Sequence, residues 1–231
     1  METGEGKKMR IGFLTEGRLS DFEKSGRAER AELYCLSFGS IGEVDYGKEV
    51  RGESAELEEV ALFSRNFECT VITGCYTNAK GVKRRSAVVA DRGKILGISD
   101  MTAGFDGDKY KCGFGVRVYE TRAGRIGVVV GQDLYFPELI RSLAQCGSEL
   151  IVVLYENLGD SLEQILIRAD AFRFGVPLCM CAYGYAQVAE ISGRLAFASP
   201  QSPVYFSPKP MREYHLVETR LRGFYKPPEL F

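Results

Sequence analysis

Short apolar runs recur along the chain and predict β-strands separated by polar turns. Each run holds four to seven residues, is rich in Val, Ile and Leu, and is bounded by Gly, Asp, Ser or charged residues. The predicted strands are residues 10–15, 32–38, 69–74, 86–90, 94–99, 116–121, 125–130, 149–154, 176–181, 203–206 and 214–220.

Longer segments repeat apolar residues at helical spacing and predict α-helices. These segments are residues 53–67, 137–147 and 161–175. Pro137 opens the second helix and Gly147 ends it. Asp160 is the predicted N-cap of the third helix, and Gly175 ends that helix.

The strands between these helices pair as hairpins. Residues 86–99 hold two short strands around a turn at residues 91–94, where Gly93 can adopt the positive φ that a tight turn needs. Hairpins that alternate with helices predict mixed sheets covered by helices, which is an α/β layered domain. We expect one domain over residues 1–231, with residues 221–231 as an extended C-terminal arm.

The composition narrows the class of protein. A chain of 231 residues with 45% hydrophobic residues is long and apolar enough for one large folded domain. The 30 Lys and Arg residues balance the 31 Asp and Glu residues, so net charge draws the chain toward neither nucleic acid nor anionic lipid. No apolar run approaches the roughly 18 residues that span a bilayer. We therefore expect a cytoplasmic protein without a nucleic-acid or membrane partner.

The cysteines and basic residues suggest no metal or phosphate chemistry. The seven Cys residues lie mostly in apolar runs, which indicates reduced thiols in a core. Cys179 and Cys181 could suggest a metal site, but the only histidine is His215. We interpret the basic residues 80–85 as a solvated hairpin loop, and we expect neither a metal nor another cofactor.

Segments in a fixed order carry a resemblance to a known family. They are RSAVVADRGKILG (85–97), YKCG (110–113), GRIGVVVGQDLYFPELIRSLAQCGSELIVVL (124–154) and GRLAFASP (193–200). The first is similar to the pattern N-S-A-V-V-I-D-x-x-G-x-I-L-G, and the third to G-R-I-G-V-x-I-C-Y-D-x-R-F-P-E-L, with Asp133 and FPEL in register. Both patterns belong to the carbon-nitrogen hydrolase, or nitrilase, superfamily. The resemblance covers about residues 54–220 and implies a four-layer αββα sandwich.

The resemblance also indicates where catalytic residues would stand. Members of the superfamily use a Cys nucleophile, a Glu general base and a Lys that stabilises the tetrahedral intermediate. Gly131 stands where the Cys is expected. Met101, next to Asp100, stands where the Lys is expected, and Phe38 stands where the Glu is expected, with Glu43 nearby. The resemblance therefore implies a pseudoenzyme that keeps a ligand-binding, regulatory or assembly role.

A retained cleft would lie around the vacated positions. We expect Gly131 and Gln132 to floor it and Phe38 and Met101 to flank it, so that the cleft is more apolar than an amidase pocket. The full set of pocket candidates is Phe38, Met101, Gly131, Gln132, Asp133 and Phe136. We interpret Asp133 as a cap for the helix that follows it, although a functional role is also open.

Other functions stay open at this point. A divergent amidase could use a relocated nucleophile, for which the candidates are Cys75, Cys112, Cys179 and Cys181. A purely structural role would leave the pocket filled. The resemblance also implies a homodimer that forms through the helices predicted at 137–147 and 161–175.

Overall fold

The computed structural model describes residues 9–104, 107–159 and 161–208. One mixed sheet has the strand order β13-β1-β2-β4-β5-β6, and the short strand β3 (Val44–Asp45) also pairs with β4. Its other strands are β13 (Val204–Phe206), β1 (Ile11–Leu14), β2 (Leu33–Leu36), β4 (Thr70–Ala79), β5 (Val82–Asp91) and β6 (Lys94–Asp100).

The second sheet has the order β12-β11-β10-β9-β8-β7. Its strands are β12 (Leu195–Ser199), β11 (Tyr185–Ala189), β10 (Leu178–Ala182), β9 (Leu150–Leu154), β8 (Gly124–Val130) and β7 (Arg117–Thr121). The central strands β8, β9 and β10 are parallel, as are β1, β2 and β4 in the first sheet. Carboxyl ends of parallel strands in an α/β fold are a common location for ligand sites.

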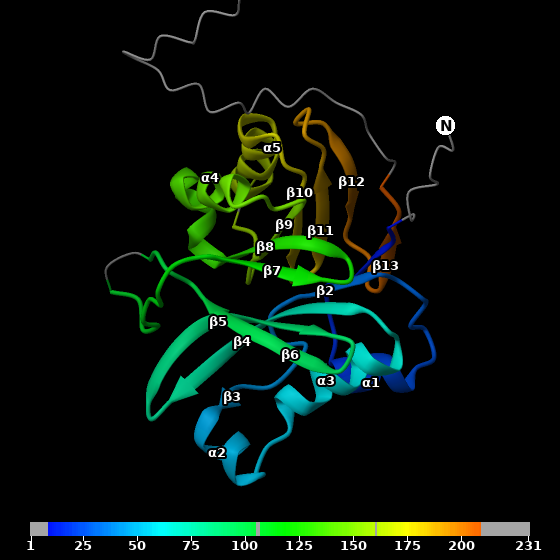
Figure 1. Cartoon of the computed structure of the whole chain (residues 1–231), viewed down its shortest axis with the longest axis vertical. Coiled ribbons are helices and arrows are strands. Elements are labelled where there is room, and N and C mark those ends of the chain that lie inside the picture. The colour runs from blue at the N-terminus through cyan, green and yellow to red at the C-terminus, as the bar shows by residue number, and fades with distance from the viewer. Residues whose placement is uncertain (1–8, 105–106, 160, 209–231) are drawn as a thin grey trace, which may run out of the picture.

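Helices cover the outer face of each sheet (Figure 1). The first sheet packs against α1 (Leu19–Lys24) and α3 (Glu56–Asn66), and the second against α4 (Pro137–Gln145) and α5 (Leu162–Phe174). A third apolar cluster lies between the sheets and draws residues from both. The order of layers is therefore helix, sheet, sheet, helix, as the resemblance implies. The small helix α2 (Tyr46–Arg51) buries no residue.

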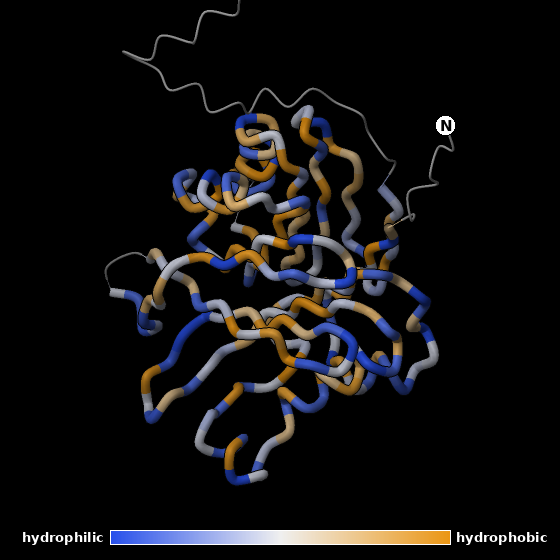
Figure 2. Tube along the Cα trace, in the orientation of Figure 1, coloured by the Kyte–Doolittle hydropathy of each residue, from blue (hydrophilic) through white to orange (hydrophobic). Residues whose placement is uncertain are grey.

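The strand sequences follow from this arrangement. Successive residues of a strand face opposite sides, and here both sides are covered. In β9, Leu150, Val152 and Leu154 join the cluster between the sheets. Ile151 and Val153 join the cluster beneath α4 and α5. Strands of this kind read as continuous apolar runs, which Figure 2 shows as hydrophobic stretches in the two sheets.

Most of the predicted elements are confirmed. The hairpin of β5 and β6 turns at Arg92 and Gly93, whose φ angles are 47° and 88°, and Gly175 ends α5 with φ 63°. The sequence prediction missed β11, the two-residue strand β3, and the helices α1 and α2, whose six residues make fewer than two helical turns and so show no helical periodicity. The predicted cap Asp160, the strand 214–220 and the arm 221–231 lie outside the described residues. None of the described helices is long and apolar enough to cross a membrane.

Replacing Gly74 by Ala tests how tightly the first sheet packs. A Cβ atom at Gly74 in β4 would lie 2.6 Å from Cδ2 of the Phe38 ring, so the ring or the strand must move. We expect Gly74→Ala to lower the free energy of unfolding by about 1–3 kcal/mol in urea denaturation. Gly159→Ala is the control, because no atom lies within 4 Å of its added Cβ. Equal stability of the two variants would contradict this packing.

Candidate functional site

The segment after β8 forms a sharp strand-to-helix elbow. β8 ends at Val130, a 3-10 helix η1 covers Gly131–Tyr135, and α4 begins at Pro137. Gly131 has φ +55°, in the left-handed region where glycine carries no steric penalty. A Cβ atom at Gly131 would lie 3.1 Å from Sδ of Met101. The elbow therefore presents only backbone at its apex.

The other two positions suggested by the resemblance are buried inside the protein. Met101 follows β6 and is fully buried, and Phe38 follows β2 and is 7% exposed. Both belong to the apolar cluster between the sheets. The Phe38 ring packs against Tyr76, with 5.5 Å between ring centroids. The structure thus brings Met101 against Gly131, while Phe38 packs against Gly74 and Tyr76.

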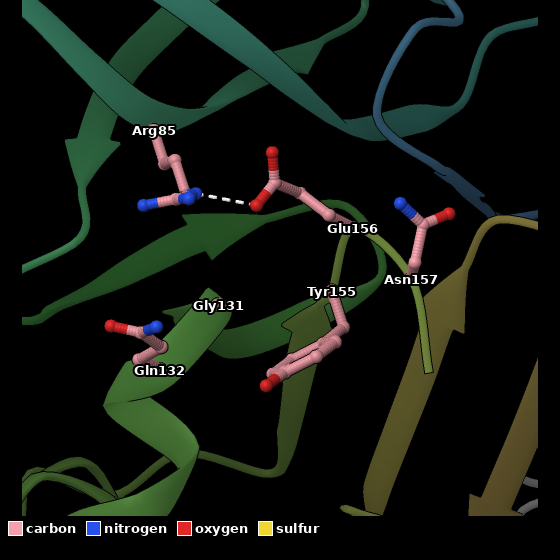
Figure 3. A pocket seen from close by; sticks show the side chains of 6 residues that line it. All are labelled: Arg85, Gly131, Gln132, Tyr155, Glu156 and Asn157. Atoms are coloured by element: carbon pink, nitrogen blue, oxygen red, sulfur yellow. Dashed lines mark hydrogen bonds and ion pairs between the residues drawn. The ribbon is translucent and has the colours of Figure 1, made fainter. Parts of the chain in front are cut away.

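A small cleft of about 170 Å³ opens at the elbow (Figure 3). Its lining residues are Arg85, Gly131, Gln132, Tyr155, Glu156 and Asn157. Gly131 and Gln132 are among the lining residues, whereas Phe38 and Met101, which we expected to flank the cleft, are not. The side chains of Phe38 and Met101 are packed into the core, and polar residues of β5 and of the loop after β9 line the cleft instead.

An arginine held between two carboxylates dominates the cleft. Nε of Arg85 donates to Oε2 of Glu156 at 2.5 Å, and Nη1 of Arg85 donates to Asp108. The guanidinium also lies over the ring of Tyr110, with 4.4 Å from Cζ to the ring centroid. Tyr76 stacks on Tyr110 and donates its hydroxyl proton to the other oxygen of Glu156.

These contacts keep the ion pairs charged. Burial works against the charge of Arg85, but hydrogen bonds to Asp108 and Glu156 raise the pKa of Arg85 above its usual value. Burial also opposes ionisation of Asp108, yet the N–H of Tyr110 and the Arg85 guanidinium lower the pKa of Asp108. Burial, together with the bond to Glu156, raises the pKa of Tyr76, so that this hydroxyl stays protonated.

Asp133 fastens the elbow to the loop after β6. Its Oδ1 accepts hydrogen bonds from the N–H of Thr102 at 2.9 Å, the hydroxyl of Thr102 at 3.0 Å and the N–H of Ala103 at 2.7 Å. The interpretation of Asp133 as a helix cap was wrong: α4 has Phe136 at its N-cap position and no side-chain cap. Asp133 lies within η1 and faces the neighbouring loop, so it positions Gly131 and Met101 relative to each other.

Behind the cleft lies a chain of hydroxyl groups that ends on a carboxylate. The Tyr155 hydroxyl is 3.0 Å from the Tyr135 hydroxyl, which donates to Oε1 of Glu163. Glu163 belongs to α5 and is only 5% exposed. Burial and the bond to Tyr135 raise the pKa of Tyr155.

The remaining pocket candidate, Phe136, lies in a different depression. With Thr102, Ala103, Phe114 and Leu139 it helps to line an open groove of about 410 Å³. Gln132 and Phe136 therefore face separate surfaces of the same elbow.

The candidate nucleophiles differ sharply in accessibility. Cys75, Cys179 and Cys181 are at most 1% exposed, and burial raises the pKa of Cys75 and of Cys181. Cys112 is exposed. A Cβ atom built at Gly104 would lie 3.5 Å from both Cys112 Sγ and Gln132 Oε1, so this thiol lies beside the edge of the cleft. Among the described residues, no group of His, Cys, Asp and Glu could hold a metal ion.

The comparison with family models agrees with this fold and elbow. Residues 38–201 match the model of the carbon-nitrogen hydrolase family. The chain belongs to the carbon-nitrogen hydrolase family. The match includes β8, the elbow and α4, as well as the positions of Phe38 and Met101.

Individual relatives of this carbon-nitrogen hydrolase family member are distant. A probable nitrilase of Schizosaccharomyces pombe is 25% identical over 140 residues, which cover 56% of this chain and 51% of that protein. The chain thus aligns with about half the length of that relative. A mutant of the Nesterenkonia AN1 amidase, of the nitrilase superfamily, has a TM-score of 0.68 at 18% identity over 87% of this chain and 90% of that one. Nit3 of Saccharomyces cerevisiae has a TM-score of 0.73 at 15% identity over the same shares.

The sequence analysis of this carbon-nitrogen hydrolase family member missed four residues of the cleft: Arg85, Tyr155, Glu156 and Asn157. Arg85 was assigned to a solvated loop, which describes the exposed Lys80 and Lys83 but not Arg85, whose side chain is 14% exposed. One signal was present: the family pattern begins N-S-A-V-V, and Arg85 stands in place of its Asn. Glu156 gave no signal, because it lies in a loop without a motif.

Replacing Asp133 by Asn tests whether this buried carboxylate makes the stability of the protein depend on pH. Burial raises the pKa of Asp133 to about 6, and its hydrogen bonds from Ala103 and Thr102 limit the rise. A raised pKa means that stability is full below about pH 4 and is lost as the pH rises through about 6. We expect the free energy of unfolding of the natural chain to fall by up to about 3 kcal/mol over this range.

Asp133→Asn keeps the acceptor oxygen for Thr102 and Ala103 but does not titrate. Urea denaturation at several pH values should therefore show a flatter profile for this variant between pH 4 and 6. An unchanged slope would assign the pH dependence to another group.

Proposed function

We propose that this chain is a catalytically inactive member of its family that binds a small ligand in the cleft at the elbow. The observation that carries the proposal is Gly131 at the apex of the elbow, with Met101 against it. Hydrolysis of an amide by this family requires a nucleophile, a base and a cation around one carbon atom. Gly131, Met101 and Phe38 supply none of these groups.

A related structure supports the comparison of the elbows. In a mutant of the Nesterenkonia AN1 amidase, acrylamide has added to the active-site cysteine. The proposal is that Gly131 stands at the corresponding place, where no covalent adduct can form. The cleft that remains is lined by polar groups and is open, which argues against a purely structural role with a filled pocket.

A divergent amidase is the second candidate, and Cys112 is the observation that favours it. Of the four candidate nucleophiles, Cys112 alone is exposed, and it lies beside Gln132 at the edge of the cleft. The buried thiols Cys75, Cys179 and Cys181 cannot reach a substrate without local unfolding.

Activity measurements separate the two candidates. We expect the natural chain to release no ammonia from acetamide, propionamide or acrylamide, with an active amidase as positive control. We expect Gly131→Cys to gain no activity, because Met101 and Phe38 still provide neither a cation nor a base. Turnover that disappears in Cys112→Ser would refute the proposal and establish the divergent amidase.

We further propose that the chain forms a homodimer through an apolar patch on α5. Leu162, Ile165 and Phe172 lie within about 80° of one another on the helix at 100° per residue, and they are 44%, 56% and 54% exposed. Exposed apolar residues on one helical face indicate a protein interface.

Sedimentation velocity tests the dimer. We expect the natural chain to sediment as a dimer and Phe172→Asp to weaken dimerisation at least tenfold, because a carboxylate would be buried at the interface. Val50→Asp is the control, since Val50 is 88% exposed on α2 in another layer. A monomeric natural chain, or equal effects of the two variants, would contradict the proposal.

A further inference from the structure

Glu163 determines which groups donate and which accept in the hydrogen-bond chain behind the cleft. This carboxylate is 95% buried, since 5% of the residue is exposed. Its Oε1 accepts the proton of Tyr135, and its Oε2 has no hydrogen-bond partner within the part of the chain that the structure describes. A buried carboxylate with an unsatisfied oxygen is costly unless positive charge lies nearby.

This order of donors and acceptors decides what Tyr155 offers to a ligand in the cleft. Tyr135 donates its proton to Glu163, so the Tyr155 proton is directed toward the Tyr135 oxygen, 3.0 Å away, and toward Glu163 itself. The Tyr155 proton is then directed away from the cleft that Tyr155 lines. Tyr155 therefore offers the cleft an oxygen acceptor rather than a donor.

On the opposite wall of the cleft, the donors are likewise directed to carboxylates. Tyr76 and Arg85 both donate to Glu156, and Arg85 also donates to Asp108. Two carboxylates thus already bind the guanidinium, which leaves Arg85 poorly placed to capture a further anion. Among the described residues, the Arg85 guanidinium is paired with the carboxylates of Glu156 and Asp108, and Glu163 adds a third carboxylate behind Tyr155. These four groups together carry two excess negative charges.

Within the described part of the chain, Lys109 is a further cation near the cleft, and it offsets little of this excess. Lys109 lies 5.0 Å from the centroid of the Tyr110 ring, but Lys109 is exposed and its charge is screened by water and salt. Glu163, by contrast, is buried, where a charge acts over a longer range.

We infer that the ligand of this cleft is a small organic cation that donates N–H groups, such as a primary ammonium or an amidinium. The inference rests on the proposed binding function and adds the chemical class of the ligand. Tyr155 and Glu156 would accept its N–H protons, and the buried charge of Glu163 would stabilise its positive charge. A carboxylate would be repelled, and a neutral amide would gain hydrogen bonds without the attraction of opposite charges.

Calorimetric titration of the full chain tests the inference with four probes of similar size: acetamidinium, ethylammonium, acetamide and acetate. We expect saturable binding of the two cations, acetamide at least tenfold weaker than acetamidinium, and no binding of acetate. Glu163→Gln should weaken acetamidinium binding about five- to tenfold and change acetamide binding less than twofold, because it removes a charge but keeps a group that can bond to Tyr135. The control Glu58→Gln, at an exposed position of α3, should change neither.

If Glu163→Gln does not fold, as judged by circular dichroism, Tyr155→Phe is the second variant. It removes one acceptor from the cleft wall and should weaken acetamidinium binding at least threefold. Binding of acetate or acetamide as tight as that of the cations, or binding of no probe, would overturn the cation inference. Hydrolysis of acetamide would instead overturn the proposed function itself.

Discussion

The two sheets pack face to face, and every feature of the cleft depends on that contact. Val152 of β9 and Val128 of β8 meet residues such as Cys35 of β2 in one apolar cluster between the sheets. Burial of apolar area supplies most of the stabilisation of such a sandwich. The contact also aligns the strand ends, so that Met101 after β6 reaches Gly131 after β8. Substitutions that shift either sheet would therefore also shift the residues of the elbow.

The elbow keeps its shape without a side chain at its apex. A side chain at this positive φ would store strain that the surrounding structure must hold. Gly131 removes that strain, since glycine adopts φ +55° freely. Asp133 still joins η1 to Thr102 and Ala103, although its burial is unfavourable to the carboxylate at neutral pH. The framework of the site is thus maintained by hydrogen bonds that do not need a nucleophile.

The side chains around the elbow are of two kinds, apolar and charged. Phe38 and Met101 extend the core, while Arg85 and Glu156 bring charge to the cleft. Arg85 is paired with Glu156 and with Asp108, as its partial burial requires. The charges that remain in excess are negative and lie on Glu163 and on the carboxylates around Arg85. In the function proposed for this chain, the cleft would then select a ligand by charge and hydrogen bonding rather than by chemical reaction.

The sequence by itself determined the layered α/β fold and the elbow. Apolar runs such as residues 149–154 identify strands covered on both faces, and the segment 124–140 identifies a strand, a turn and a helix start, because these signals are local along the chain. It also indicated that Gly131, Met101 and Phe38 carry no reactive group.

Only the tertiary structure decided the nature of the cleft. Arg85 and Glu156 are 71 positions apart, and Tyr155 and Tyr135 come from different segments to meet Glu163 of α5. Their pairing depends on how β5, β9 and α5 approach one another, which no periodicity records. Asp133 likewise has a sequence position suited to a cap, but the packing of the loop after β6 gave it closer donors. Local patterns specify elements, whereas the partners of a polar side chain are chosen by the packing of elements distant in sequence.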